Sequence, residues 1–169
     1  LAIFLTMFFL VWVMNAYNFV DGIDGMATSG AILSSISIAL VIVVTNGYII
    51  SAELLFLLFS TMLSFLIFNW PPAKIFMGDS GSVFLGYFFG CMVLYTIMRG
   101  EVSIWSWIIV FGYYISDTTI TQITRLIMVR KWYFAHRSHA YQNFARITNS
   151  HLRTNLFFII YYLIWLLPL

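Results

Sequence analysis

The sequence predicts an all-α protein, a polytopic bundle of transmembrane helices with about six spans. The first observation is composition: the chain is 62% hydrophobic and only 8% charged. A soluble domain carries about a quarter charged residues, so this chain would expose too much apolar surface to water. The second observation is that the apolar residues form runs that approach the roughly 20 residues a helix needs to cross a bilayer.

Six apolar runs alternate with polar connections, and they are predicted at 1–14, 27–45, 49–68, 82–98, 104–124 and 155–169. Because each span reverses the side, the connections 15–26, 69–81 and 125–154 share one face of the membrane. The short connections 46–48 and 99–103 share the other. The first face carries seven of the eight Lys and Arg residues. The excess of positive charge predicts that this face is cytoplasmic.

The two ends of the chain are apolar. The sequence begins at Leu1, without a Met, inside one apolar run and ends at Leu169 inside another. We therefore expect a single integral membrane domain over residues 1–169 that is truncated at both ends. The one cysteine, Cys91, excludes a disulfide within the chain.

The first long connection reads "NAYNFVDGIDGMA" and repeats an amide or a carboxylate at every third position, at Asn15, Asn18, Asp21 and Asp24. Such a repeat slips around an α-helix but lines up on a 3₁₀ turn, and the glycines between the groups permit close approach to a ligand. A capped helix end is the ordinary interpretation of Asp and Asn here. Four such groups exceed what capping requires, so the pattern favours a cation site.

The second long connection reads "NWPPAKIFMGDSGSVFLG". Its two prolines end the preceding helix and stiffen the exit. Asp79 then stands between Gly78 and Gly81 at the start of the next span, where small residues and free N–H groups suit an anion or a metal. A serine that caps the next helix would explain part of this motif, but capping does not require Asp79.

The third long connection contains "RKWYFAHRSHAYQNFAR". Its basic residues suit either anionic lipid headgroups or substrate phosphates. A nucleic-acid partner is not expected, because the chain has no soluble domain and no large basic surplus. Together, the three connections offer oxygen ligands for a divalent cation and positive groups for phosphates, the combination that phosphoryl transfer needs.

One further acid, Asp117, lies in "YYISDTTITQITR" inside the fifth apolar run. An ionisable residue at that depth faces protein or water. A role near the active site and a structural hydrogen-bond node both remain open for it.

The motifs "NxxNFxDGxDGxA", "FMGDxGSxxLG" and "RSH", in this order between spans, resemble the polyprenyl-phosphate N-acetylhexosamine-1-phosphate transferases. This superfamily includes the phospho-N-acetylmuramoyl-pentapeptide transferases and the enzymes that initiate O-antigen. The resemblance covers the whole chain. It implies transfer of a sugar 1-phosphate from a UDP-N-acetylhexosamine to undecaprenyl phosphate, with release of UMP, at the bacterial inner membrane. It also implies Mg²⁺, or Mn²⁺ in its place, as cofactor.

The resemblance implies roles for individual side chains. The implied metal ligands are Asn18 and Asp79. The implied catalytic residues are Asp21, Asp24 and His139. The implied substrate-binding residues are Asn69, Lys74, Phe76 and Arg137, and among these Phe76 is expected to stack on uracil.

Two departures from the family pattern carry expectations of their own. The family has an upstream acidic "DDxxD" motif for the lipid phosphate, which this sequence lacks. We therefore expect the chain to be the C-terminal part of a longer transferase and to be inactive alone. Many members also have two further His where this chain has Tyr141 and Gln142. "HRSHAYQ" resembles the branch that initiates O-antigen on UDP-N-acetylfucosamine or UDP-N-acetylquinovosamine.

Two other classes of membrane protein also carry polar residues between or within apolar spans. A transporter would place polar groups near the midplane in broken helices, whereas here most of them lie near one face. An intramembrane aspartyl protease needs two Asp deep in facing spans, and Asp117 is the one deep Asp. A homodimer is an open alternative for the assembly.

Overall fold

The computed structural model describes residues 1–47, 49–128 and 138–166, and within these ranges it contains seven helices and no strand. The all-α prediction is therefore confirmed. The helices are α1 (Ala2–Val20), α2 (Met26–Asn46), α3 (Ile50–Asn69), α4 (Gly78–Met98), α5 (Ile104–Met128), α6 (Ala140–Thr148) and α7 (His151–Trp165).

Within the described ranges, α1, α2, α3 and α4 are each long and apolar enough to cross a membrane. They overlap the first four predicted spans. The fifth predicted span lies inside α5, and the described part of the sixth lies mostly inside α7. The fold is accordingly an all-α membrane bundle.

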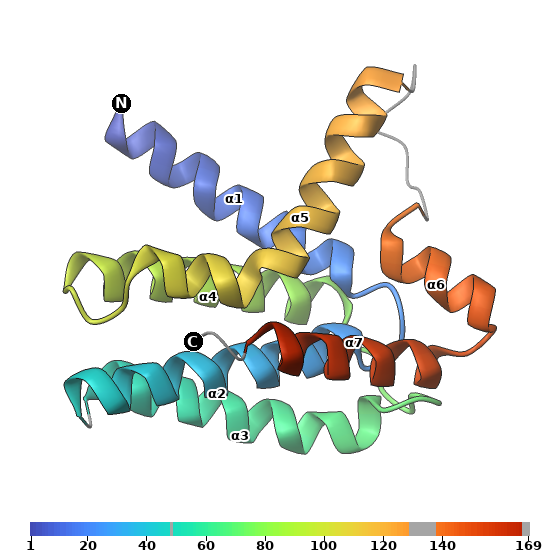
Figure 1. The fold of residues 1–169 in the computed structure, drawn as a ribbon, viewed down its shortest axis with the longest axis horizontal. Helices are drawn as coiled ribbons and strands as arrows, with labels where there is room; N and C mark the ends of the chain where they lie inside the picture. Colours follow the sequence, from blue (N-terminus) through green and yellow to red (C-terminus); the bar gives the residue numbers. More distant parts are fainter. Residues whose placement is uncertain (48, 129–137, 167–169) are drawn as a thin grey trace.

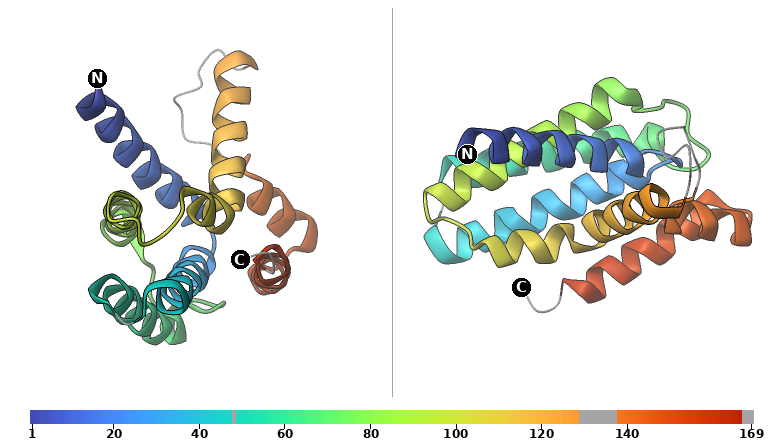
Figure 2. Two further views of the ribbon diagram at one scale, coloured as in Figure 1. Left: turned by 60° about the vertical axis from the view of Figure 1, so that its left-hand side comes forward. Right: turned by 90° about the horizontal axis from the view of Figure 1, so that it is seen from above.

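The helices pack in two long pairs. α2 lies along α3, and α1 packs against α4, while α5 contacts α1 and α2 and α7 contacts α2 and α6. Figures 1 and 2 show that α5 bends, so that its second half leaves the direction shared by α2, α3 and α4. The turns after α1 and α3 lie at the same end of the bundle as α6 and the start of α7 (Figure 1).

A glycine sets the distance between α1 and α4. A Cβ atom added at Gly86 would lie 2.5 Å from the Cα of Met14, so no larger residue fits there without moving a backbone. Small residues permit this kind of close helix contact in membranes. One helical turn further along each helix, the same crossing brings Asn18 of α1 beside Ser82 of α4.

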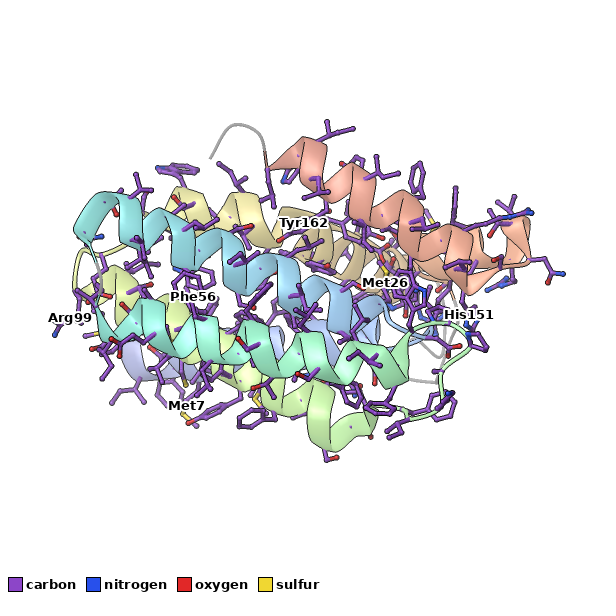
Figure 3. The ribbon with its side chains drawn as sticks, turned by 90° about the horizontal axis from the view of Figure 1, so that it is seen from below. Met7, Met26, Phe56, Arg99, His151 and Tyr162 are labelled. Carbon is purple, nitrogen blue, oxygen red and sulfur yellow. The ribbon has the colours of Figure 1, made fainter. Side chains whose placement is uncertain are left out.

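At the opposite end of the bundle, Glu101 links the connections between helices through hydrogen bonds. The carboxylate of Glu101 accepts hydrogen bonds from the Ser51 hydroxyl and from Arg99, both at 2.6 Å. Asn46 donates to the backbone carbonyl of Glu101 at 2.7 Å. Arg99 is the one basic residue on the face predicted to be extracytoplasmic, and Figure 3 shows it at the end opposite His151.

Candidate active site

Helix α1 is longer than the sequence pattern indicates. It continues to Val20, so Asn15 and Asn18 lie on its last turns rather than in a loop. The reason is that its buried residues follow helical spacing up to Val20, and no glycine interrupts the chain before Gly22. The expected 3₁₀ alignment of four polar groups does not form. The exposed Asn15 donates its amide to the carbonyl of Val11 on its own helix, at 2.7 Å.

Asn18 joins the first two motifs. Its Nδ2 donates to Oδ1 of Asp79 at 2.9 Å and to Oγ of Ser82 at 3.1 Å. Asp79 stands in the first turn of α4, where the helix N-terminus favours a negative charge. The contact at Gly86, one turn deeper, explains why α1 and α4 bring these side chains within hydrogen-bonding distance.

Asp21 is the residue that caps the end of α1, and its carboxylate lies near Asp79. Its half-buried carboxylate accepts a hydrogen bond from the backbone N–H of Gly78, at the start of α4. The pKa of Asp21 is raised from 3.8 to about 6, chiefly by burial. The Gly78 hydrogen bond opposes this rise, and the nearby negative charge of Asp79 adds to it. The two carboxylates are therefore close enough to repel each other.

This group of donors fits a magnesium ion that substrate helps to hold. Among the described residues, no cluster of three or more His, Cys, Asp or Glu comes together. Mg²⁺ is commonly bound through one or two carboxylates, with substrate phosphates and water filling the other positions. Asp79 and Asp21 supply carboxylates, and a cation between them would relieve the repulsion between the two negative charges.

Asp24 does not join Asn18, Asp21 and Asp79 but contacts helix α7. Its Oδ2 accepts the backbone N–H of Ala73 at 3.2 Å and lies 3.3 Å from Nδ1 of His151. Its backbone carbonyl accepts a hydrogen bond from Nδ2 of Asn155. Asp24 and His151 line a cavity of about 720 Å³, whose other walls come from the proline pair after α3 and from α6.

Asn69 connects the first two loops. Its buried Oδ1 accepts hydrogen bonds from the N–H of Gly25 and the hydroxyl of Thr28, and its Nδ2 donates to the carbonyl of Ile75. Gly25 has a φ of +75°, a conformation that suits glycine. The amide of Asn69 thus orients the loop that carries Phe76. Direct contact between Asn69 and substrate stays a prediction.

Two predicted substrate-binding residues are exposed on the second loop. The Phe76 side chain is 72% exposed, and Lys74 is exposed beside it. A flat ligand could therefore reach the Phe76 ring without rearrangement of the loop. The third predicted contact of this kind, Arg137, lies outside the described residues, and so do Arg130, Lys131 and His136.

His139 is enclosed at the start of α6. It is 2% exposed, and its ring lies between those of Phe19 and Tyr141. Its Nδ1 is 3.4 Å from Oδ2 of Asp117, whose Oδ1 accepts the backbone N–H of Ala140 at 2.9 Å. Asp117 therefore holds the first turn of α6, as the hydrogen-bond-node interpretation describes. The catalytic role of His139 stays a prediction.

Sequence reasoning missed His151 and Asn155. They lie one helical turn apart on α7, and Figure 3 shows His151 at the end of the bundle that carries the motif loops. Ser150 signals a helix start, since its Oγ accepts the N–H of Arg153. Nothing local indicates which loop the new helix meets, because Asn155 and Asp24 are 131 residues apart.

Comparison with known proteins gives consistent relatives. The model of glycosyl transferase family 4 matches residues 1–97. The chain is 34% identical, over 87% of its length, to the probable undecaprenyl-phosphate N-acetylglucosaminyl 1-phosphate transferase of Bacillus subtilis. It is 30% identical, over the same share, to the phospho-N-acetylmuramoyl-pentapeptide-transferase of Streptococcus thermophilus. The chain spans 41% of the length of each of these two relatives.

Proposed function

Because the chain belongs to glycosyl transferase family 4, we propose that it forms part of the active site of a membrane transferase. The enzyme moves an N-acetylhexosamine 1-phosphate from a UDP-sugar to undecaprenyl phosphate and releases UMP. One observation carries the proposal. Asn18 and Asp79, from motifs 61 residues apart, meet at 2.9 Å beside the carboxylate of Asp21.

Asn18 and Asp79 are the proposed ligands of Mg²⁺, or of Mn²⁺ in its place. A divalent cation there would neutralise part of the diphosphate charge of the UDP-sugar. Asp21 supports this group by joining the end of α1 to the start of α4 through its bond to Gly78. The hydrogen bond from Asn18 to Asp79 fixes the direction of the Asp79 carboxylate, so the group is ordered before substrate arrives.

The nucleotide is proposed to lie on the second loop. Its uracil would stack on the exposed ring of Phe76, and Lys74 would meet a phosphate. Base–aromatic stacking contributes on the order of 1–3 kcal/mol per base in nucleic-acid systems. The loop is suited to this role because Asn69 ties it at Ile75 to the first loop. Arg137 and His139 are proposed to serve the phosphates and the reacting groups from the third loop.

The protein is proposed to lie in the bacterial inner membrane with the three motif loops in the cytoplasm. The seven-to-one distribution of Lys and Arg supports this orientation. The resemblance of "HRSHAYQ" to the O-antigen-initiating branch makes UDP-N-acetylfucosamine and UDP-N-acetylquinovosamine the first sugars to assay. In this chain Tyr141 is buried and donates to the carbonyl of Phe19, so it occupies a structural position.

The contacts of the aspartates favour the transferase over the two other classes. Asp79 bonds to Asn18 of α1, whereas Asp117 bonds to the first turn of α6. An aspartyl protease would need such residues to face each other. The proposed metal ligands and the cavity at Asp24 also lie at one end of the bundle. A transporter would have its site at mid-depth.

The test is Asp79→Asn in an enzyme of the relatives' full length, assayed with Mg²⁺, a panel of UDP-sugars and undecaprenyl phosphate. We expect the variant to keep its fold and lose most turnover. Ser80→Ala, an exposed change in the same helical turn, is the matched control and should keep near-wild-type turnover. Unchanged turnover and unchanged metal dependence in Asp79→Asn would make Asp79 a structural residue. A wild type that transfers no sugar phosphate would overturn the proposed function.

A further inference from the structure

Two side chains of α7 contact Asp24, in the turn between α1 and α2. His151 and Asn155 face Asp24 from successive turns of α7. His151 Nδ1 lies 3.3 Å from the Asp24 carboxylate, and Asn155 Nδ2 donates to the Asp24 backbone carbonyl. The short turn between α1 and α2 is therefore held from outside by a helix far along the chain.

The environment of this contact is that of a ligand site. The Asp24 side chain is 19% exposed and that of His151 is 45% exposed, and both line the cavity of about 720 Å³. The second partner of the carboxylate is the N–H of Ala73, on the loop that carries Phe76. The Asp24 carboxylate thus lies between the second loop and α7, with its remaining surface toward the cavity.

His151 is not needed to begin α7. The cap of this helix is Ser150, whose Oγ accepts the N–H of Arg153 at 3.2 Å. Asn155, in turn, holds the backbone of Asp24 but does not contact its carboxylate. The orientation of the carboxylate is left to Ala73 and His151. A carboxylate with one hydrogen bond can still rotate about its own torsions, and a second polar contact from another element restricts that rotation.

We propose that His151 is a positioning residue for Asp24 in the binding of the UDP-sugar. The proposal rests on the proposed function and extends it, because it makes α7 a contributor to the site. His151 acts by fixing one rotamer of the Asp24 side chain toward the cavity, and Asn155 fixes the turn beneath it. A misplacement of a site residue by about 1 Å costs as much as a hundredfold in rate.

The experiment replaces His151 in an enzyme of the relatives' full length. We expect His151→Ala to lower kcat/KM for the UDP-sugar on the order of tenfold to a hundredfold, mostly through KM. His151→Asn should recover most of the loss, because its amide nitrogen occupies the place of Nδ1. His151→Gln should recover less, because its nitrogen occupies the place of Nε2. Arg153→Ala, an exposed basic residue on the same turn, is the control and should stay near wild type.

A double-mutant cycle separates positioning from a general structural effect. If His151 acts through Asp24, Asp24→Asn combined with His151→Ala is no worse than Asp24→Asn alone. Additive losses, equal recovery by Asn and Gln, or wild-type kinetics in His151→Ala would each overturn the proposal.

Amide exchange at Ala73, whose N–H donates to the Asp24 carboxylate, gives a readout that does not need turnover. We expect faster exchange there in His151→Ala and wild-type exchange in Arg153→Ala. Unchanged exchange in His151→Ala would overturn the positioning role even in an inactive enzyme. Loss of wild-type transfer, by contrast, would overturn the proposed function, while this exchange result still decides whether His151 orients the Asp24 carboxylate.

Discussion

Replacing Asp21 with Asn is expected to stabilise the metal-free protein at neutral pH and to weaken its response to Mg²⁺. The carboxylate is half-buried, and burial raises its pKa from 3.8 to about 6. Asn has nearly the same shape and still accepts the N–H of Gly78. The substitution therefore removes a charge that the fold accommodates poorly while it keeps the link between α1 and α4.

The size of the effect follows from the pKa. The interval from 3.8 to about 6 corresponds to about 3 kcal/mol, at 1.36 kcal/mol per pH unit. Solvent screens a half-exposed carboxylate, so about 1–2 kcal/mol is expected. Because the folded-state pKa is the higher one, ionised Asp21 destabilises the fold. This cost is absent below pH 3.8, grows as pH rises through 6 and is complete above it.

Thermal unfolding in detergent measures both the stability of the metal-free protein, with a chelator present, and its response to Mg²⁺ and UDP. With chelator at pH 7.5, the variant should unfold at a higher temperature than the wild type, and at pH 4 the two should nearly coincide. Addition of Mg²⁺ and UDP should raise the unfolding temperature of the wild type more than that of the variant. A variant that is less stable than the wild type at pH 7.5, or a difference that does not change between pH 4 and 7.5, would refute the reasoning.

Two further predictions concern the nucleotide and the membrane. Phe76→Ala should raise KM for the UDP-sugar on the order of ten- to a hundredfold while Phe76→Tyr stays mild; if Phe76→Leu binds as well as wild type, the residue packs rather than stacks. Reporter fusions at Gly47 should report the periplasm, and those at Lys74 the cytoplasm, because of the distribution of basic residues; the opposite pattern would invert the proposed orientation.

Residues close in sequence to a motif were the predictable part of the site. The alternation of apolar runs and polar connections predicts that the loops of Asn18 and Asp79 share one face, and the structure brings these two side chains into contact. The fold class was predictable for the same reason, since hydropathy reports burial in lipid directly. Asn15 was not, because its motif neighbours suggested a loop while the buried face of α1 extends the helix past it.

The contribution of α7 was not predictable, because it depends on tertiary packing alone. The sequence analysis places His151 in the connection 125–154, and nothing in the sequence relates it to Asp24, which it contacts in the structure. Asn69 illustrates the same limit. The resemblance implies a contact between Asn69 and substrate, which stays a prediction. The contacts of its amide with Gly25, Thr28 and Ile75 within the protein come from tertiary packing.

The proposed metal site, at Asn18, Asp21 and Asp79, also depends on a contact between two membrane-spanning helices. Carboxylates that bind a hydrated cation must lie at the helix ends, where water reaches them, because charge within the bilayer is costly. Their mutual distance is nevertheless set deeper, where the absence of a side chain at Gly86 lets α4 touch α1 at Met14. One turn nearer the surface, this close approach lets Asn18 of α1 donate hydrogen bonds to Ser82 and Asp79 of α4. The apolar helix pair thus determines the geometry of the polar site above it.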